Sequence, residues 1–346
     1  MGNCKIKIFV FGRDRVDWSI DKDRNATIQF LKECGFPLTR NIFQATHIYC
    51  VWYDLLFNYK YLWINYLGRV FNKKIIAVIT NDITYYLDKV NLLKKYVDIC
   101  IAPSDKIYNL LKEQKIKVQK IPFFVDVNIF RPLGISKREI CKRLGIDYKK
   151  IETRVIIGSF QRDSLGKNLQ VAKWQKNPDL LIKILQKLPS SKYILLLAGP
   201  RRHYLVKKCK EMNIPFLFYG DYSYLKKWED DIKVNNLSLD VINLLYNLTD
   251  IYIIASKSEG GPKQVLESSL TKTLVFSTKV GLAPDILHPY LLFGENEIKL
   301  TVERIRKVFE HADEFNKYVE YNFQKTRHEM DLNILKDRYR RVILEN

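Results

Sequence analysis

The chain has 346 residues, of which 47% are hydrophobic and 28% are charged, and its 58 Lys and Arg residues exceed its 38 Asp and Glu residues by 20. This composition is that of a globular protein, and it excludes collagen, a coiled coil and a disordered chain. The length predicts two domains, since one hydrophobic core rarely grows past about 250 residues. No apolar run reaches the roughly 18 residues that a membrane-spanning helix needs.

The excess of positive charge favours anionic ligands, which include sugar nucleotides, anionic lipid headgroups and nucleic acid. A lysine-rich solvated surface explains this excess of positive charge equally well. Residues 5–12 alternate charged and apolar side chains, which indicates a first strand and not a signal peptide. We expect reduced core thiols in a cytoplasmic protein, because the cysteines are scattered and form no C-x-x-C pair; they are Cys4, Cys34, Cys50, Cys100, Cys141 and Cys209.

Short β-branched and aromatic runs alternate with helical stretches along the whole chain. In the first half these segments are 6–11, 26–34, 47–52, 59–71, 75–79, 99–102 and 106–112. In the second half they are 155–160, 178–188, 193–198, 205–212, 216–219, 239–245, 251–255, 261–270 and 274–277. Strands separated by helices predict parallel sheets covered on both faces, so we expect an α/β protein with two doubly wound domains.

We place the N-terminal domain at residues 1–135 and the C-terminal domain at 150–322, because prolines and a basic stretch separate them near 130–150. A long charged helix is expected over 302–344, with a break near Lys325. Its last part, about 325–346, is expected to pack back on the N-terminal domain.

The segment 251–268 carries the most informative motif. An apolar strand is followed by a loop with two glycines, and a proline then stands where a helix begins. Such a unit presents backbone N–H groups and the positive end of a helix dipole, which suits a phosphate. Glu259 lies in the loop and Glu267 inside the helix, so the two carboxylates can bind different parts of one extended ligand. The alternative is a capped surface helix with two solvated glutamates.

The residues of this motif match, in order, the donor signature of the group 1 glycosyltransferases of the GT-B fold, and the sequence resembles that family over about residues 100–290. The matching residues are Ser256, Glu259, Gly260, Gly261, Pro262 and Glu267. The segment 121–132 is similar to the family's interdomain segment. The resemblance implies two Rossmann-like domains facing across a cleft. It also implies retaining transfer from a nucleotide-sugar donor to a saccharide or lipid-linked acceptor, as in surface polysaccharide or glycan synthesis, without a cofactor or metal.

By this resemblance, Arg162 and Lys176 bind the donor diphosphate and Glu259 orients the sugar, so we assign these three residues to catalysis. Fixed cations stabilise the negative charge that the leaving phosphate gains. Lys167 competes with Lys176 for its role, and a salt bridge to Asp163 is the alternative for Arg162. The remaining donor-binding candidates are Glu267 on the ribose, Gly260, Gly261, Ser258, Pro262, Gly12 and Arg201.

Three residues of the N-terminal half are candidates for binding the acceptor. Many relatives have a histidine where this chain has Asn81 followed by Asp82, and Asn81 can bond a sugar hydroxyl but cannot act as a base. Trp18, in a predicted loop over 13–24, is the third candidate. We expect His47 to be a structural residue of the core. Asp21-Lys22-Asp23 matches the Asp-x-Asp of metal-dependent GT-A enzymes, but nothing else in the sequence follows their order.

Two other functions remain open on the sequence alone. One is a GT-B transferase that glycosylates nucleic acid, and the other is an inactive module that binds nucleotide sugars. The aromatic and basic segment 53–74 fits peripheral contact with the inner face of an anionic membrane, although we favour core packing for its aromatic residues. The donor base, the sugar, the acceptor and the oligomeric state are not specified.

Overall fold

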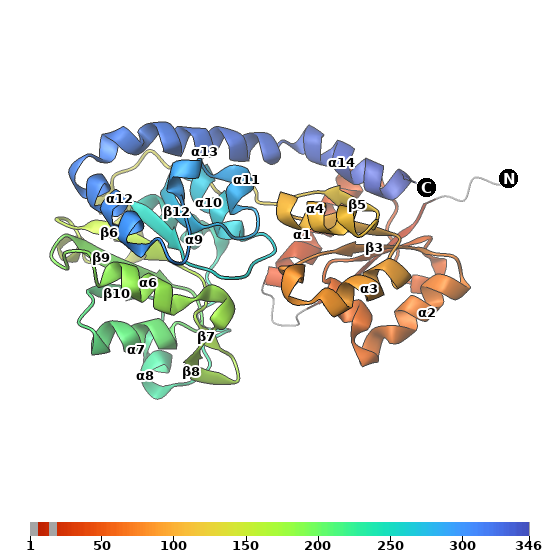
Figure 1. Cartoon of the computed structure of the whole chain (residues 1–346), viewed down its shortest axis with the longest axis horizontal. Coiled ribbons are helices and arrows are strands. Elements are labelled where there is room, and N and C mark those ends of the chain that lie inside the picture. Colours follow the sequence, from red (N-terminus) through yellow and green to blue (C-terminus); the bar gives the residue numbers. More distant parts are fainter. Residues whose placement is uncertain (1–5, 14–18, 346) are drawn as a thin grey trace. The chain divides into compact units, whose positions relative to one another are not determined.

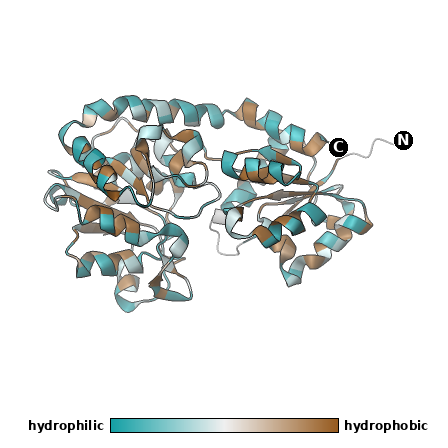
Figure 2. Ribbon diagram, viewed as in Figure 1, coloured by the Kyte–Doolittle hydropathy of each residue, from teal (hydrophilic) through white to brown (hydrophobic). Residues whose placement is uncertain are grey.

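The computed structural model describes residues 6–13 and 19–345. The chain divides into two compact units. Unit 1 comprises Met1–Phe124, Glu259–Gly261 and Glu329–Asn346, and unit 2 comprises Val125–Ser258 and Pro262–His328. Both are α/β units, and the strands of both sheets are strongly hydrophobic (Figure 2). Within the described ranges, every helix is too short or too polar to cross a bilayer.

Unit 1 contains a parallel sheet with the strand order β1-β2-β3-β4-β5. Its strands are β1 (Ile8–Phe11), β2 (His47–Cys50), β3 (Lys74–Val78), β4 (Ile99–Ala102) and β5 (Val118–Lys120). Its helices are α1 (Ser19–Glu33), α2 (Leu62–Val70), α3 (Leu87–Tyr96), α4 (Asp105–Glu113) and α14 (Leu332–Leu344). Leu38 forms a parallel bridge with Ile8 on the free side of β1. The winding of the chain therefore reverses at β1, so that the unit is doubly wound as expected.

The two faces of this sheet follow directly from the alternation of side chains along each strand. Ile48 and Cys50 point into one core, which is closed by α2, α3 and α4, whereas Tyr49 and Val51 point into the other. That second core is closed by α1 and α14, where Tyr339 of α14 stacks on Tyr49 with 6.3 Å between ring centroids. The C-terminal helix is thus an integral part of unit 1.

Unit 2 has a six-stranded parallel sheet with the order β10-β9-β6-β11-β12-β13 (Figure 1). The strands are β6 (Val155–Ser159), β9 (Tyr193–Ala198), β10 (Phe216–Tyr219), β11 (Ile251–Ile254), β12 (Leu274–Thr278) and β13 (Leu292–Phe293). The helices are α5 (Lys137–Leu144), α6 (Pro178–Leu185), α7 (His203–Glu211), α8 (Tyr222–Lys227), α9 (Leu239–Leu248), α10 (Lys263–Leu270), α11 (Ala283–Ile286), α12 (Ile298–Glu310) and α13 (Asn316–Glu329). The winding reverses between β6 and β11, which is where open α/β sheets bind their ligands.

Two sequence predictions about local structure need correction, one on the segment 302–344 and one on the segment 13–24. The segment 302–344 is not one helix broken near Lys325, because α12, α13 and α14 are separated at 311–315 and 330–331. Helix α12 ends so that Phe315 can enter the core, and Asp331 caps α14 by accepting bonds from Asn333 N and Ile334 N. The stretch after β6 contains an antiparallel hairpin, β7 (Ser164–Leu165) with β8 (Asn168–Ala172).

The predicted loop over 13–24 is also shorter than expected, because α1 already begins at Ser19. Asp21 and Asp23 therefore lie in a helix, where residues two apart do not face each other. This arrangement gives no support to the Asp-x-Asp interpretation. Trp18, the predicted acceptor contact, lies outside the described residues.

Candidate functional site

Two of the loops that carry predicted donor residues follow β6 and β11, the two strands on either side of the reversal in unit 2. The loop after β11 runs from Ala255 to Pro262, and α10 begins at Lys263. Pro262, with φ of −65°, stands immediately before the helix. The expected order of strand, glycine loop, proline and helix is confirmed, with the helix starting slightly later than predicted.

Hydrogen bonds within unit 2 fix this loop to its neighbours. The backbone N–H groups of Lys257 and Ser258 donate to the carbonyl of Gln175 at 2.8 and 3.2 Å. The Ser256 hydroxyl donates to Gln161 Oε1 at 3.3 Å, and its carbonyl accepts from the Thr278 hydroxyl at 2.5 Å. The loop is therefore held from three sides.

Two of the residues that bond to this loop are the immediate chain neighbours of the predicted cations. Arg162 follows Gln161, and Lys176 follows Gln175, so each cation adjoins a glutamine that bonds to the loop. Arg162 and Lys176 are both half-buried, whereas the competitor Lys167 is exposed in the turn of the β7–β8 hairpin. The assignment of these side chains to a diphosphate stays a prediction.

Glu267 is half-buried in α10, and a buried tyrosine fixes one of its oxygens. The hydroxyl of Tyr246, in α9, donates to Glu267 Oε2 at 2.9 Å. Burial raises the pKa of Tyr246 well above its ordinary value, which keeps the hydroxyl protonated as a donor. The Tyr246 ring packs edge-on against Phe160 and Tyr252, with centroid separations of 5.1 Å in both cases. Sequence reasoning missed this partner, because nothing in the 21-residue spacing signals the contact.

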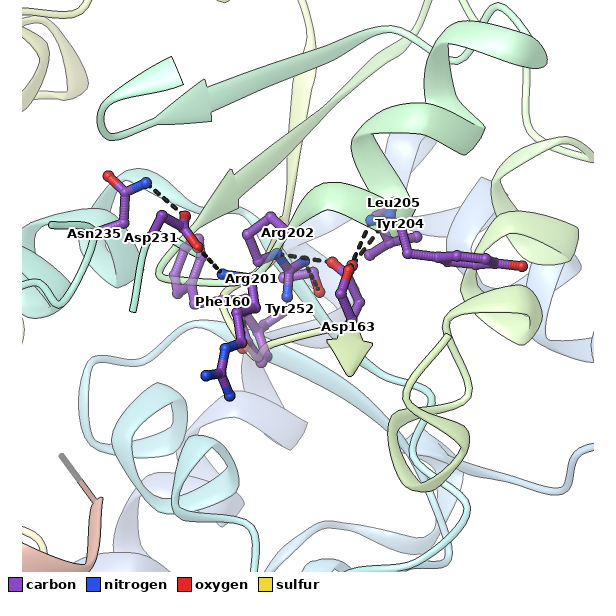
Figure 3. Close-up of polar contacts among 11 residues, drawn as sticks. Phe160, Asp163, Arg201, Arg202, Tyr204, Leu205, Asp231, Asn235 and Tyr252 are labelled. Atoms are coloured by element: carbon purple, nitrogen blue, oxygen red, sulfur yellow. Dashed lines mark hydrogen bonds and ion pairs between the residues drawn. The ribbon is translucent and has the colours of Figure 1, made fainter. Parts of the chain in front are cut away.

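A buried ion pair joins the loop after β6 to the start of α7 (Figure 3). Arg202 Nε lies 3.1 Å from Asp163 Oδ2, and both side chains are almost fully inaccessible to solvent. Asp163 Oδ1 also accepts from the backbone N–H of Leu205 at 3.1 Å, and Arg202 Nη2 donates to the Ser159 hydroxyl at 3.0 Å. Burial raises the pKa of Asp163, and the Arg202 charge opposes that rise.

This pair changes the interpretation of the two neighbouring arginines. The sequence offered Arg162 as a possible partner of Asp163, but the buried ion pair of Asp163 is made with Arg202. The amides of Asp163 and Ser164 both donate to the Arg201 carbonyl at 3.1 Å. The pair and these backbone bonds together fix the positions of the chain at Arg162 and Arg201.

Arg201 is more constrained than a surface-loop residue. Its Nε and Nη2 donate to the two oxygens of Asp230 at 2.9 and 2.7 Å, and its backbone N–H donates to Asp231 Oδ1 at 2.7 Å. The Arg201 bond lowers the pKa of Asp230, so the pair stays charged. Gly166 lies against the guanidinium, where a Cβ would come within 2.4 Å of Nη1. The two aspartates were not identified from the sequence.

In unit 1, Gly12 directly follows β1 with φ of +115°, and a Cβ there would lie 2.7 Å from Val51 Cγ2. Glycine is therefore required at this turn for conformational reasons alone. The predicted role of Gly12 in donor binding stays a prediction.

The acceptor candidates Asn81 and Asp82 both have partners inside unit 1. Asn81 Nδ2 donates to Asp54 Oδ2 at 2.8 Å, and Lys89 Nζ lies 2.5 Å from Asp54 Oδ1. Asp82 is buried, pairs with Lys106 at 2.6 Å and accepts bonds from the amide and hydroxyl of Thr84. These contacts fix the position of the Asp82 carboxylate, and the side-chain carbonyl oxygen of Asn81 is the group that suits a sugar hydroxyl. The assignment of both residues to the acceptor stays a prediction.

Histidine 47 has the structural environment expected from the sequence. Its two ring nitrogens contact the Thr46 hydroxyl at 2.8 Å and the Ile343 carbonyl at 3.1 Å. Burial lowers its pKa, which favours the neutral ring. The described cysteines Cys34, Cys50, Cys100, Cys141 and Cys209 are free and buried, in agreement with core thiols, and Cys4 lies outside the described residues.

Residues 167–325 match the family described as glycosyl transferases group 1. The matched part includes Lys176, Arg201, Glu259 and Glu267, and Arg162 lies just before it. No curated protein matches the sequence.

Solved structures match the chain over almost its whole length. HepE of Anabaena in complex with UDP and glucose superposes with a TM-score of 0.73 and 13% identity, covering 99% of this chain and 100% of that one. Sucrose-phosphate synthase from Thermosynechococcus elongatus gives a TM-score of 0.65 at 13% identity, covering 97% and 81%. A glycosyltransferase from Rickettsia africae gives 0.64 at 18% identity, covering 99% of each chain. Residues 167–325 thus match the group 1 glycosyl transferases, and the chain has a GT-B fold.

Proposed function

We propose that the protein is a retaining glycosyltransferase that uses a UDP-sugar and transfers the sugar to a saccharide or lipid-linked acceptor in polysaccharide or glycan synthesis. The main support for a donor site is that three loops meet at the strand reversal of unit 2. There the loops bearing Arg162, Lys176 and Ser258 are tied together through Gln161 and Gln175. The choice of uracil is supported by the solved structure of HepE, which contains UDP.

In this proposal each group of residues has one task. Arg162 and Lys176 bind the diphosphate, with Arg201 nearby. Glu267 accepts bonds from the ribose, and Tyr246 orients its carboxylate. Glu259 orients the sugar ring, and the backbone around Ser258, Gly260, Gly261 and Pro262 supports the phosphates, together with Gly12. Asn81, Asp82 and Trp18 are assigned to the acceptor side.

The chemistry needs no base from the protein. The bond between the anomeric carbon and the phosphate oxygen breaks, and an acceptor hydroxyl bonds to the same face of the carbon. The acceptor proton passes to the leaving phosphate, and UDP departs. The two cations stabilise the negative charge on that phosphate, a task that in other enzymes a metal performs. We therefore propose that activity does not require a divalent metal.

Thermal unfolding with UDP, GDP, ADP and dTDP, followed by transfer assays with the matching sugars, tests the proposal. Of the four nucleotides, we expect only UDP to raise the unfolding temperature clearly, since a ligand that binds only the folded state stabilises it. We also expect transfer that persists in EDTA and a product with the anomeric configuration of the donor. Nucleotide binding without any transfer or donor hydrolysis would indicate an inactive binding module, and inversion of configuration would refute the retaining mechanism.

A further inference from the structure

Helix α2 is apolar on both of its faces, which is unusual for a helix at the surface of a domain. Ile64 and Gly68 face the sheet, where a Cβ on Gly68 would lie 2.5 Å from Ile75 Cδ1. The opposite face carries Leu62, Trp63, Tyr66 and Val70, whose exposed fractions are 49, 49, 68 and 55%. At 100° per residue, these four positions form one continuous arc.

The exposed face continues onto neighbouring segments of unit 1. Phe71 follows the helix and is 55% exposed, and its ring lies edge-on to Phe43, which is 64% exposed, with 6.3 Å between centroids. We call Phe43, Leu62, Trp63, Tyr66, Val70 and Phe71 the aromatic patch. Contiguous exposed apolar surface of this kind marks an interaction site more often than solvated surface. The expectation that the aromatic residues of 53–74 are core residues is therefore wrong for Trp63, Tyr66 and Phe71.

The segment 58–74, which carries the aromatic patch apart from Phe43, has charged side chains of one sign. Residues 58–74 contain no Asp or Glu, and their basic residues are Lys60, Arg69, Lys73 and Lys74. Lys73 is buried and donates to backbone carbonyls, and Lys74 bonds to the backbone of the C-terminal segment. Lys60 and Arg69 remain exposed beside the patch, and the Lys60 ammonium lies 5.6 Å from the Tyr59 ring centroid. The preceding acid, Asp54, is paired with Lys89.

We propose that the aromatic patch docks unit 1 on the surface of an anionic lipid bilayer. Trp and Tyr favour the boundary between lipid and water, Leu62, Val70 and the phenylalanines supply apolar area for insertion, and Lys60 and Arg69 face anionic headgroups. The complementarity of charge favours this occupant over a second copy of the chain, whose own patch carries the same sign. The inference depends on residues of unit 1 alone and goes beyond the proposed transfer reaction.

Flotation of the full chain with phosphatidylcholine vesicles, with and without phosphatidylglycerol, tests the inference. We expect binding only to the anionic vesicles, with release by high salt. Leu62→Ser/Tyr66→Ser is expected to weaken partitioning about tenfold, because it removes two exposed apolar groups from the interface. Lys60→Glu/Arg69→Glu is expected to abolish the preference for anionic vesicles.

Tyr321→Ser/Leu300→Ser is the matched control, since it makes the same changes at residues of unit 2 that are 43 and 41% exposed. It should float like the unmodified chain, and circular dichroism should show that all variants are folded. The inference is overturned if the folded chain does not float with anionic vesicles, or if the control loses binding equally. It is also overturned if Leu62→Ser/Tyr66→Ser abolishes self-association and leaves flotation unchanged. UDP binding is measured in parallel without vesicles. This measurement distinguishes a failure of the membrane-docking proposal from a failure of the proposed function.

Discussion

Glu267 and Tyr246 show, at the scale of single residues, how a buried group can set the position of a binding carboxylate. The tyrosine hydroxyl donates to Glu267 Oε2 and thereby fixes the orientation of the carboxylate. Because the ring is packed between Phe160 and Tyr252, the hydroxyl cannot move without disturbing the core. Under the proposed function, the affinity for the donor therefore depends on a residue that need not contact it.

Tyr246→Phe removes only this hydroxyl and keeps the ring. We expect donor affinity to fall about fivefold, since a hydrogen bond to a charged group contributes about 1 kcal/mol or more, with little change in kcat. The measurement is the Kd for UDP-sugar by calorimetry, with KM and kcat alongside. Tyr193→Phe is the matched control, because its buried hydroxyl donates to the Leu185 carbonyl, a bond that does not involve Glu267. Equal losses in both variants, or none in Tyr246→Phe, would contradict the role given to Tyr246.

The ion pair of Asp163 and Arg202 makes a different residue-scale prediction, about stability. Asp163→Ala leaves a buried arginine without its partner, so we expect a loss of about 3–5 kcal/mol. Asp163→Ala/Arg202→Met removes both charges and should recover a large part of that loss. Urea unfolding midpoints give the ranking. The account would be contradicted if Asp163→Ala were as stable as the parent chain. It would also be contradicted if the double variant lost as much stability as Asp163→Ala and Arg202→Met lose together when made singly.

At the scale of elements, the loop after β11 shows why some loops can be predicted from sequence. In this loop the glycines allow a tight turn and Pro262 fixes its own φ just before the helix, so strand, loop and helix follow from local pattern. The break between α12 and α13 could not be predicted in this way, because it depends on the burial of Phe315 in the core. The exposure of Trp63 and Tyr66 was missed for a related reason, since aromatic periodicity does not show which face of a helix is covered.

The turn after β1 provides a test with an internal comparison. Gly12 and Gly35 both have positive φ, of +115° and +83°, but only Gly12 has atoms in the space of a Cβ. Gly35→Ala should cost about 1 kcal/mol, the typical strain of a left-handed residue, whereas Gly12→Ala should cost more because of the contact with Val51. Thermal unfolding of both variants measures the difference. Equal unfolding temperatures would show that the Val51 contact relaxes without cost.

At the scale of the whole molecule, strand order carries more information about function than net charge. The surplus of 20 positive charges is compatible with several anionic partners. The strand reversal between β6 and β11 instead singles out one edge of the sheet in unit 2. Sequence reasoning placed Arg162 at the end of a strand and Lys176 at the start of a helix but could not show the bonds through Gln161 and Gln175. Such long-range contacts have no local signature, and the same holds for Arg201 with Asp230.

The central claim is that cations and carboxylates of these loops bind one UDP-sugar, and donor kinetics of three variants test it most directly. Arg162→Ala should lower kcat about 100-fold or more, because it removes a charge that stabilises the leaving phosphate. Glu267→Ala should raise the donor Kd about tenfold or more, because it removes a charged hydrogen-bond acceptor. Lys167→Ala, in the exposed hairpin turn, should behave like the parent enzyme. Parent-like kcat in Arg162→Ala together with a parent-like donor Kd in Glu267→Ala would contradict the account.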